Sequence, residues 1–194
     1  MFKFLLIIFI CLNFATSTSV LSKFIDSNQP FLDSPIKLVQ FEYITQNLDG
    51  LPENGSGSIL IGLDKYKLNL KNHIFLFSGL GLKRYNKITN QIFIENKNPR
   101  IDSLILNFFN IQTLDMIKVD SNGIINNLPS NFETKHITID LDFLSDSSSI
   151  KGINIQSSNY FISLFNLNFS HHALDLDNSF SFDFPDAFIF DLRD

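Results

Sequence analysis

"SILIGLDKYKLNLK", residues 58–71, contains two short apolar runs with Gly62-Leu63-Asp64 between them. In the second run Tyr66, Leu68 and Leu70 alternate with polar residues, so an extended chain carries all three on one face. Glycine and aspartate are frequent in tight turns. The stretch therefore predicts two β-strands joined by a turn, each strand with one apolar face.

The same period of two recurs along most of the chain. In "HITIDLDF", residues 136–143, apolar and polar residues alternate as in 65–71. Further candidate strands lie at 36–44, 73–77, 91–95, 153–156, 160–169, 180–184 and 188–192. Turns are predicted at Asn54-Gly55, Ser78-Gly79, Asn122-Gly123 and 145–149, with the glycine-rich residues 55–58 as a hairpin loop. We expect about ten or eleven strands, mostly antiparallel because the connections are short.

Residues 99–111, "PRIDSLILNFFNI", break this pattern. Leu104, Ile105, Phe108 and Phe109 recur at helical spacing, and Asp102 or Ser103 is a candidate N-cap. A helix of about two turns, over 103–111, must cover a surface of the β-structure. A second short helix is expected at residues 20–29, ended by Pro30.

The first 17 residues have the features of a secretory signal peptide. Lys3 precedes an apolar run from Phe4 to Leu12, and small residues follow at 15–17. The run is shorter than the ~20 residues of a membrane-spanning helix. Cys11, the single cysteine, lies inside it. Acylation of Cys11 is the alternative, but the bulky Ile10 occupies the position where a small residue is needed. We expect cleavage near Ser17 and an exported, cysteine-free product.

Charge and motifs exclude several classes of function. The net charge of −5, with no basic block, argues against a nucleic-acid partner. No nucleophile motif, phosphate loop or zinc motif is present, so we expect neither an enzyme nor a cofactor. His171 and His172, with Asp175 and Asp177, offer metal ligands, but adjacent residues on a strand point to opposite faces. We therefore expect no metal site.

Two packings fit the alternating strands. One is a sandwich whose apolar faces fill each other. The other is a curled sheet around an apolar cavity that the 103–111 helix closes.

Three segments resemble the LolA family, the periplasmic carriers of outer-membrane lipoproteins. "GSILIGLDKYKLNL", residues 57–70, is similar to the family's opening strand–turn–strand, with Gly57 and the Lys65–Leu68 run in place. "FSGLGLKRYNKITNQIFI", residues 77–94, resembles its next hairpin at Gly79, Tyr85 and Asn86. "FSFDFPDAFIFDLRD", residues 180–194, resembles its ending, which closes on Asp-Leu-Arg.

The resemblance also has departures. Ser78 and Lys83 stand where the hairpin usually has aspartate and tryptophan. In the best-studied branch a Lys-Arg-Pro turn supplies an arginine that tethers the lid, and this chain has Gly62-Leu63-Asp64 there. That tether is not carried over.

The resemblance implies a mainly β fold: an unclosed antiparallel β-barrel with a short helical lid and a short N-terminal helix, formed by residues 18–194. The expected acyl-chain cavity is lined by Phe41, Ile59, Ile61, Tyr66, Leu68, Leu70, Ile92, Ile94, Ile137, Ile139, Leu141, Phe182 and Phe184. The expected lid residues are Leu104, Ile105, Phe108 and Phe109. The terminal phenylalanines, Phe180 to Phe190, are expected on the inner face of the last strands.

The implied function is a periplasmic carrier that takes acylated lipoproteins from an inner-membrane export complex and delivers them to the outer membrane, with an acceptor there. We expect it to act as a monomer. Two other interpretations stay open: a LolA-like lipid-sensing or regulatory binding protein, and an exported β-protein with a filled core. Fold alone does not separate them.

Overall fold

The computed structural model describes residues 20–47, 52–119, 125–127, 137–144, 148–157, 160–171 and 176–193. The predicted signal peptide, residues 1–17, and the predicted turn at Asn122-Gly123 lie outside them.

Ten strands form one sheet in the order β12-β6-β5-β4-β3-β2-β1-β11-β10-β9. Their bounds are β1 Lys37–Asn47, β2 Glu53–Ile61, β3 Tyr66–Asn69, β4 His73–Phe77, β5 Leu82–Asn86, β6 Gln91–Glu95, β9 Ile137–Phe143, β10 Ile150–Ser157, β11 Tyr160–His171 and β12 Phe188–Asp191. Among the described strands, β12 and β9 are the two ends of this sheet, so it does not close. The expected mainly β, unclosed fold is confirmed. One pair, β12 with β6, is parallel.

Five short helices and a second small sheet complete the described fold. The helices are α2 Val20–Ser27, α3 Gln29–Leu32, α4 Pro99–Asn107, α5 Ile111–Met116 and α6 Leu176–Ser179. The small sheet pairs β7 (Lys118–Val119) with β8 (Ile125–Asn127). Among the described residues, no helix has the length and apolar character needed to cross a membrane.

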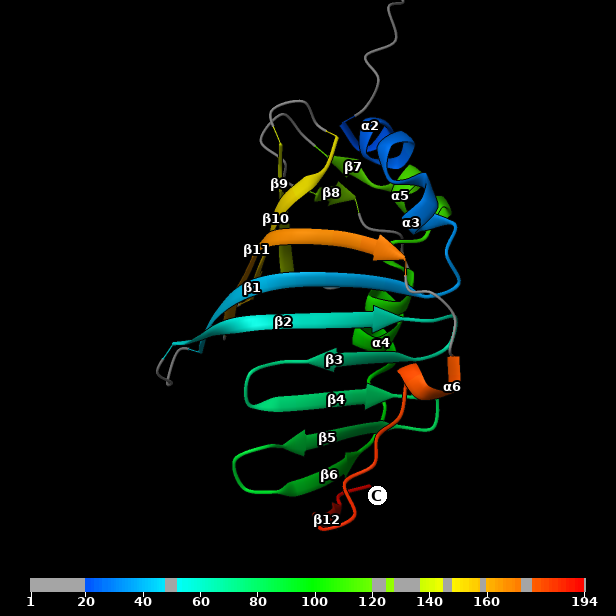
Figure 1. The fold of residues 1–194 in the computed structure, drawn as a ribbon. Coiled ribbons are helices and arrows are strands. Elements are labelled where there is room, and N and C mark those ends of the chain that lie inside the picture. The colour runs from blue at the N-terminus through cyan, green and yellow to red at the C-terminus, as the bar shows by residue number, and fades with distance from the viewer. Residues whose placement is uncertain are drawn as a thin grey trace, which may run out of the picture.

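The large sheet has two faces that the alternation of side chains distinguishes. We call the face covered by α4 the inner face; Ile59, Ile61 and Tyr66 lie on it. The opposite, outer face carries Leu60 and Lys67. In Figure 1, α4 lies behind the sheet, and α6 with the C-terminal segment lies in front of it.

The predicted turn at Asn54-Gly55 and the predicted loop at 55–58 are wrong, because β2 runs straight through them. Gly55 pairs with Tyr43 and Gly57 with Phe41 on β1. A Cβ atom on Gly57 would lie only 2.6 Å from the Phe41 ring. The glycines make room for two inward aromatic side chains and so belong to a strand. The turn at Ser78-Gly79 is confirmed, with Gly79 at φ 76°.

The N-terminal helix begins at Val20 as predicted, but the ends of the helices differ from the prediction. Pro30 does not end the N-terminal helix; it lies in the first turn of a second one, α3, where its missing N–H costs nothing. Likewise, Asn98 and not Asp102 or Ser103 caps α4, accepting a hydrogen bond from the Ile101 N–H, with Pro99 in the first turn. The predicted 103–111 helix is therefore two helices, α4 and α5.

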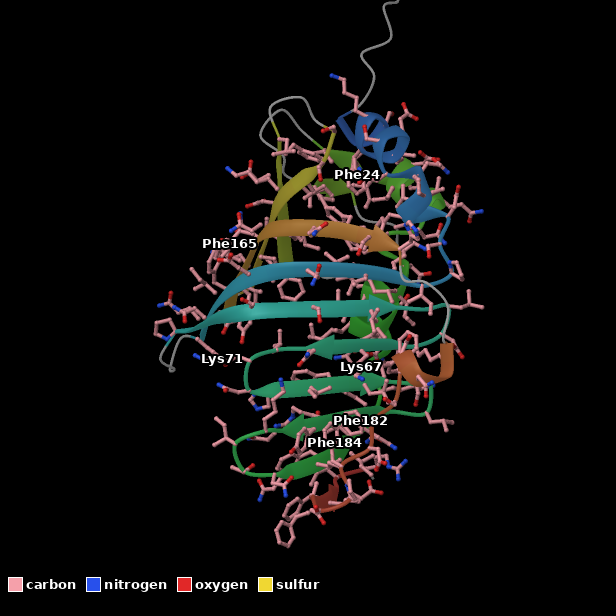
Figure 2. The ribbon with its side chains drawn as sticks, viewed as in Figure 1. Phe24, Lys67, Lys71, Phe165, Phe182 and Phe184 are labelled. Atoms are coloured by element: carbon pink, nitrogen blue, oxygen red, sulfur yellow. The ribbon has the colours of Figure 1, made fainter. Side chains whose placement is uncertain are left out.

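The C-terminal segment packs on the outer face, contrary to the prediction. Residues 181–187 form no strand. Phe180 is buried against Ile36 and Leu76, and Phe184 stacks on Tyr85 at 3.8 Å between ring centroids. Figure 2 shows Phe182, Phe184 and Lys67 on this same side of the sheet. The reason is the connection: the chain crosses the front of the sheet before β12 pairs beside β6.

β12 itself is largely exposed. Phe188 is 70% exposed, and Ile189, Phe190 and Leu192 are exposed too. The predicted apolar inner face of the last strand is thus an edge strand with little covering it among the described residues.

Candidate apolar ligand-binding site

A cavity of about 130 Å³ lies between the inner face of the sheet and α4. The strands β1, β2, β9, β10 and β11, which are neighbours in the sheet, form its wall. The lining side chains are Val39, Phe41, Ile59, Ile61, Ile139, Ile153, Ile155, Leu164 and Leu167 from the sheet, and Leu104, Ile105, Phe108 and Phe109 from α4 and the residues just after it. Every one of them is aliphatic or aromatic, so the lining offers burial of apolar groups and no acid–base group.

Simple alternation explains most of the wall. Val39 and Phe41 on β1, Ile59 and Ile61 on β2, and Ile153 and Ile155 on β10 are pairs two residues apart, which share a face. The two leucines of β11, Leu164 and Leu167, are three apart and would point to opposite faces of a regular strand.

A β-bulge brings these two leucines onto the same face. The register between β1 and β11 shifts between Gln40 and Glu42, and Asn166 has a φ of 53°, in the left-handed region. Its side-chain amide donates to Glu42 Oε1 at 3.1 Å. Asparagine tolerates this backbone conformation better than most residues, so Asn166 is the sequence signal that was missed.

The four predicted lid residues all line the cavity. Leu104 and Ile105 project from α4, and Phe108 and Phe109 follow directly after it. Phe109 also packs edge-to-face against Phe31 and Phe169. The chain just after α4 is therefore anchored in the aromatic core, whereas α4 itself covers the cavity.

The structure brings together some of the predicted cavity residues and separates others. Phe41, Ile59, Ile61 and Ile139 line the cavity. Leu141 is buried in the core around the cavity but does not line the cavity. Leu68 and Leu70 are half-buried and pack against the same core. Ile137 begins β9, and its side chain is outside the described part of the chain.

Four predicted cavity residues lie on the other face. Ile92 pairs with Tyr85 and Ile94 with Lys83, and these partners belong to the outer face. Phe182 and Phe184 pack there as well. Alternation alone identified two apolar faces, and the inner face of β6 turned out to carry Phe93 in place of the two isoleucines. Val39, Ile153, Ile155, Leu164 and Leu167 were not predicted.

Tyr66, also a predicted cavity residue, makes a polar contact beside the cavity. Its hydroxyl donates to Asp102 Oδ1 at 2.8 Å, and Asp102 Oδ2 accepts from the Asn98 N–H at 2.8 Å. Tyr66 and Asp102 are each 3% exposed. Burial, followed by the hydrogen bond to Asp102, raises the pKa of Tyr66 well above its ordinary value, so the phenol stays protonated and remains the donor.

The candidate metal ligands around His171 lie largely outside the described residues. No group of three or more His, Cys, Asp or Glu residues in the described part of the chain could hold an ion. His171 is exposed at the end of β11, and His172 and Asp175 lie outside the described residues.

No protein-family model matches the sequence, and no curated protein matches it either. Among solved structures, the chain is similar to a LolA superfamily protein from Nitrosomonas europaea, with 9% identity, a TM-score of 0.43, and coverage of 84% of this chain and 97% of that one. It is also similar to an uncharacterized conserved protein from Thermus thermophilus, with 9% identity, a TM-score of 0.47, and coverage of 89% and 96%. Because both TM-scores lie below 0.5, no residue role is transferred from either structure.

Proposed function

We propose that this protein is a periplasmic carrier that binds the acyl chains of lipoproteins in the cavity under α4 and delivers them to the outer membrane. The observation that carries the proposal is the cavity wall, which is aliphatic or aromatic at every lining position and is covered by a short helix. A wall of this kind matches hydrocarbon and offers nothing to a polar substrate.

The energetics of acyl chains explain why a carrier needs such a wall. Burial of each CH₂ contributes about 0.8 kcal/mol, so one long acyl chain gains on the order of 10 kcal/mol from leaving water. A lipoprotein moves from a membrane to a carrier to a useful extent only if burial of its acyl chains in the carrier contributes a comparable free energy. The inner face of β1, β2, β9, β10 and β11 provides that apolar surface.

From the size of the cavity we infer that this conformation is the closed state of the proposed carrier. At about 130 Å³ it resembles engineered apolar cavities of ~150 Å³ that accept benzene. A long acyl chain needs several times this space. The extra room lies under α4, because outward movement of this nine-residue helix uncovers the wall that Leu104 and Ile105 contact. We therefore assign α4 as a lid.

The cellular setting of the proposal comes from the sequence. The predicted signal peptide supports export, and the three segments that resemble the LolA family support a lipoprotein as cargo. We propose an inner-membrane export complex as the donor, an outer-membrane acceptor as the recipient, and a monomeric carrier between them.

The test is binding of a synthetic triacylated lipopeptide to the purified protein, with the same peptide lacking its acyl chains as the control. We expect saturable binding of the acylated form alone, measured by displacement of a fluorescent apolar probe. Absence of saturable binding by the folded protein would overturn the proposal.

Two matched variants on one helix locate the site. Ile105→Trp places a larger side chain into the cavity, whereas Ile101→Trp changes the same residue type one turn earlier, where Ile101 is 44% exposed. We expect Ile105→Trp to weaken lipopeptide binding about tenfold and Ile101→Trp to leave it unchanged. Equal effects of the two variants would place the acyl chains elsewhere.

A further inference from the structure

The contact between Tyr66 and Asp102 joins the two parts of the molecule that must separate when cargo enters. Tyr66 is the first residue of β3 in the sheet, and Asp102 lies in the first turn of α4. Within the described residues, the other side-chain hydrogen bonds of α4 stay inside the helix and its cap: the Asn98–Ile101 and Asn98–Asp102 contacts, and Asn107 to Ser103.

The two partners are held in place to different degrees. The Tyr66 ring stacks on Phe77, with 5.3 Å between ring centroids, on the neighbouring strand β4. This stacking fixes the hydroxyl relative to the sheet. Asp102 moves with α4, whose apolar contacts lie above a hollow and are therefore incomplete.

The hydrogen bond is directional, whereas the other lid contacts are not. Leu104, Ile105 and Phe108 can slide over an aliphatic wall at little cost, since hydrophobic contact has no preferred direction. A hydrogen bond weakens steeply once its geometry is lost, and bonds to a carboxylate are among the stronger ones. With α4 closed, both groups are buried, so a hydrogen bond to water cannot take the place of this one. When α4 opens, both groups can form hydrogen bonds to water.

The adjacent turn does not supply this contact. Leu63 is 95% exposed, and Lys65 lies 5.0 Å from the ring centroid of Phe180, which belongs to the outer-face cluster. These two side chains are therefore directed away from α4.

We propose that the Tyr66–Asp102 hydrogen bond is a latch that holds α4 closed over the empty cavity and breaks when an acyl chain enters. The inference rests on the proposed carrier function and adds its control element. One such bond is small compared with the gain from burying an acyl chain, so cargo can displace it. It is sufficient to keep the lid closed between cargoes.

Tyr66→Phe tests the latch, because it removes the hydroxyl and keeps the ring that stacks on Phe77. The matched control is Tyr43→Phe. Tyr43 is also buried and donates to a carboxylate, Glu53 Oε1, at 2.9 Å, but this bond joins β1 to β2 within the sheet. Both variants lose a tyrosine hydroxyl's hydrogen bond to a carboxylate, and only the first loses it at the lid.

The primary measurement is amide hydrogen exchange, which needs no cargo. In Tyr66→Phe we expect the amides of α4 to exchange about tenfold faster than in the wild type. The amides of β1, β2 and β11 should keep their wild-type exchange rates. In Tyr43→Phe we expect no selective change in α4. A uniform increase over the whole chain in Tyr66→Phe, or an equal α4 effect in the control, would overturn the latch and leave a merely stabilising bond.

A second variant tests whether the two side chains act as a pair. Asp102→Ala should also accelerate exchange in α4, and adding Tyr66→Phe to it should change nothing further, since the partner is already gone. Additive effects would overturn the pairing.

Binding kinetics separate this inference from the proposed function. The association rate of anilinonaphthalene sulfonate and of the triacylated lipopeptide should rise about tenfold in Tyr66→Phe if opening limits entry. If the wild type binds no lipopeptide, the carrier function fails, whatever hydrogen exchange shows. If the wild type binds it but Tyr66→Phe has the same association rate and the same α4 exchange, the latch alone fails.

Discussion

The two faces of the large sheet differ in how their apolar side chains are covered: the inner face encloses a cavity, whereas the outer face of β2–β6 is filled by the C-terminal segment. On the inner face, α4 and the residues that follow it cover the wall and leave about 130 Å³ beneath them. On the outer face, the irregular segment after α6 places Phe180 directly onto Ile36 and Leu76. A helix keeps a fixed cylinder shape, so its fit to a curved wall is incomplete, whereas an irregular segment adapts to the surface below it.

This difference separates function from stability in the same sheet. Contacts at the filled outer face contribute to folding and have no space for a ligand. Contacts at the inner face divide into a floor, formed by the sheet residues that line the cavity, and the α4 side, which in the proposed carrier is a lid that moves away to admit cargo. Substitutions at the floor, the outer face and the lid should therefore give three different combinations of stability and binding.

The largest effect is expected at the floor of the cavity. Ile139 on β9 is 3% exposed and lines the wall. Ile139→Glu would leave a carboxylate in an apolar wall without a cation, which costs about 3–5 kcal/mol. We expect the protein to be mostly unfolded at 37 °C, measured by circular dichroism during thermal unfolding. Cooperative unfolding at the wild-type temperature would contradict this prediction, because it would mean that water already reaches the side chain at position 139.

The next largest effect is expected at the filled outer face. Phe180→Ala should lower the free energy of unfolding by about 3 kcal/mol, because it removes a buried ring between Ile36 and Leu76. Lipopeptide affinity of the folded fraction should not change. Phe188→Ala is the control on the same segment, since Phe188 is 70% exposed and its loss should cost less than about 0.5 kcal/mol. Weaker lipopeptide binding by Phe180→Ala would contradict the separation of the two faces.

A smaller loss of stability, with a larger loss of function, is expected at the lid. Phe108 lines the cavity and is buried in the closed state. In Phe108→Glu, outward movement of the lid allows water to reach the carboxylate, so we expect a loss of about 2 kcal/mol, less than for Ile139→Glu. Uptake of lipoprotein from inner-membrane vesicles should fall. If Phe108→Glu unfolds as readily as Ile139→Glu, the helix belongs to the core and is not a lid.

The sequence predicted the strands better than the faces. The alternation in 65–71 and 136–143 identified β3 and β9, since side chains two apart must share a face. Which face receives α4 depends on contacts far apart in the chain, and alternation carries no information on these. Ile92 and Phe184 were assigned to the cavity for this reason and lie on the outer face.

Local exceptions to the period of two caused the remaining misses. Leu164 and Leu167 required the bulge at Asn166 to share the cavity. Gly55 and Gly57 suggested a loop by composition, although their role depends on the partner strand β1. The helix beside the cavity, in contrast, was predictable, because helical spacing of Leu104, Ile105 and Phe108 within a β-protein is itself an unusual local signal.

The smallest expected effect comes from these glycines, and it tests how the floor is built. A Cβ at Gly57 would lie 2.6 Å from the ring of Phe41, which lines the cavity, so in Gly57→Ala this ring must shift. Overpacking of this kind costs about 1–3 kcal/mol, and the reduced freedom of the unfolded chain returns about 0.5–1 kcal/mol. We expect a net loss of about 1 kcal/mol in chemical denaturation.

The direction in which Phe41 moves decides the effect on binding. With β2 directly behind the ring, the free space lies in the cavity, so the ring should move there and reduce the room for a ligand. Affinity for anilinonaphthalene sulfonate should fall about fivefold. Gly55→Ala is the control: its Cβ would meet Tyr43 at 3.3 Å, a contact outside the cavity lining, and affinity should not change. Equal probe affinity in the two variants would show that Phe41 relaxes along the strand, and that the cavity wall is more adaptable than its packing against Gly57 indicates.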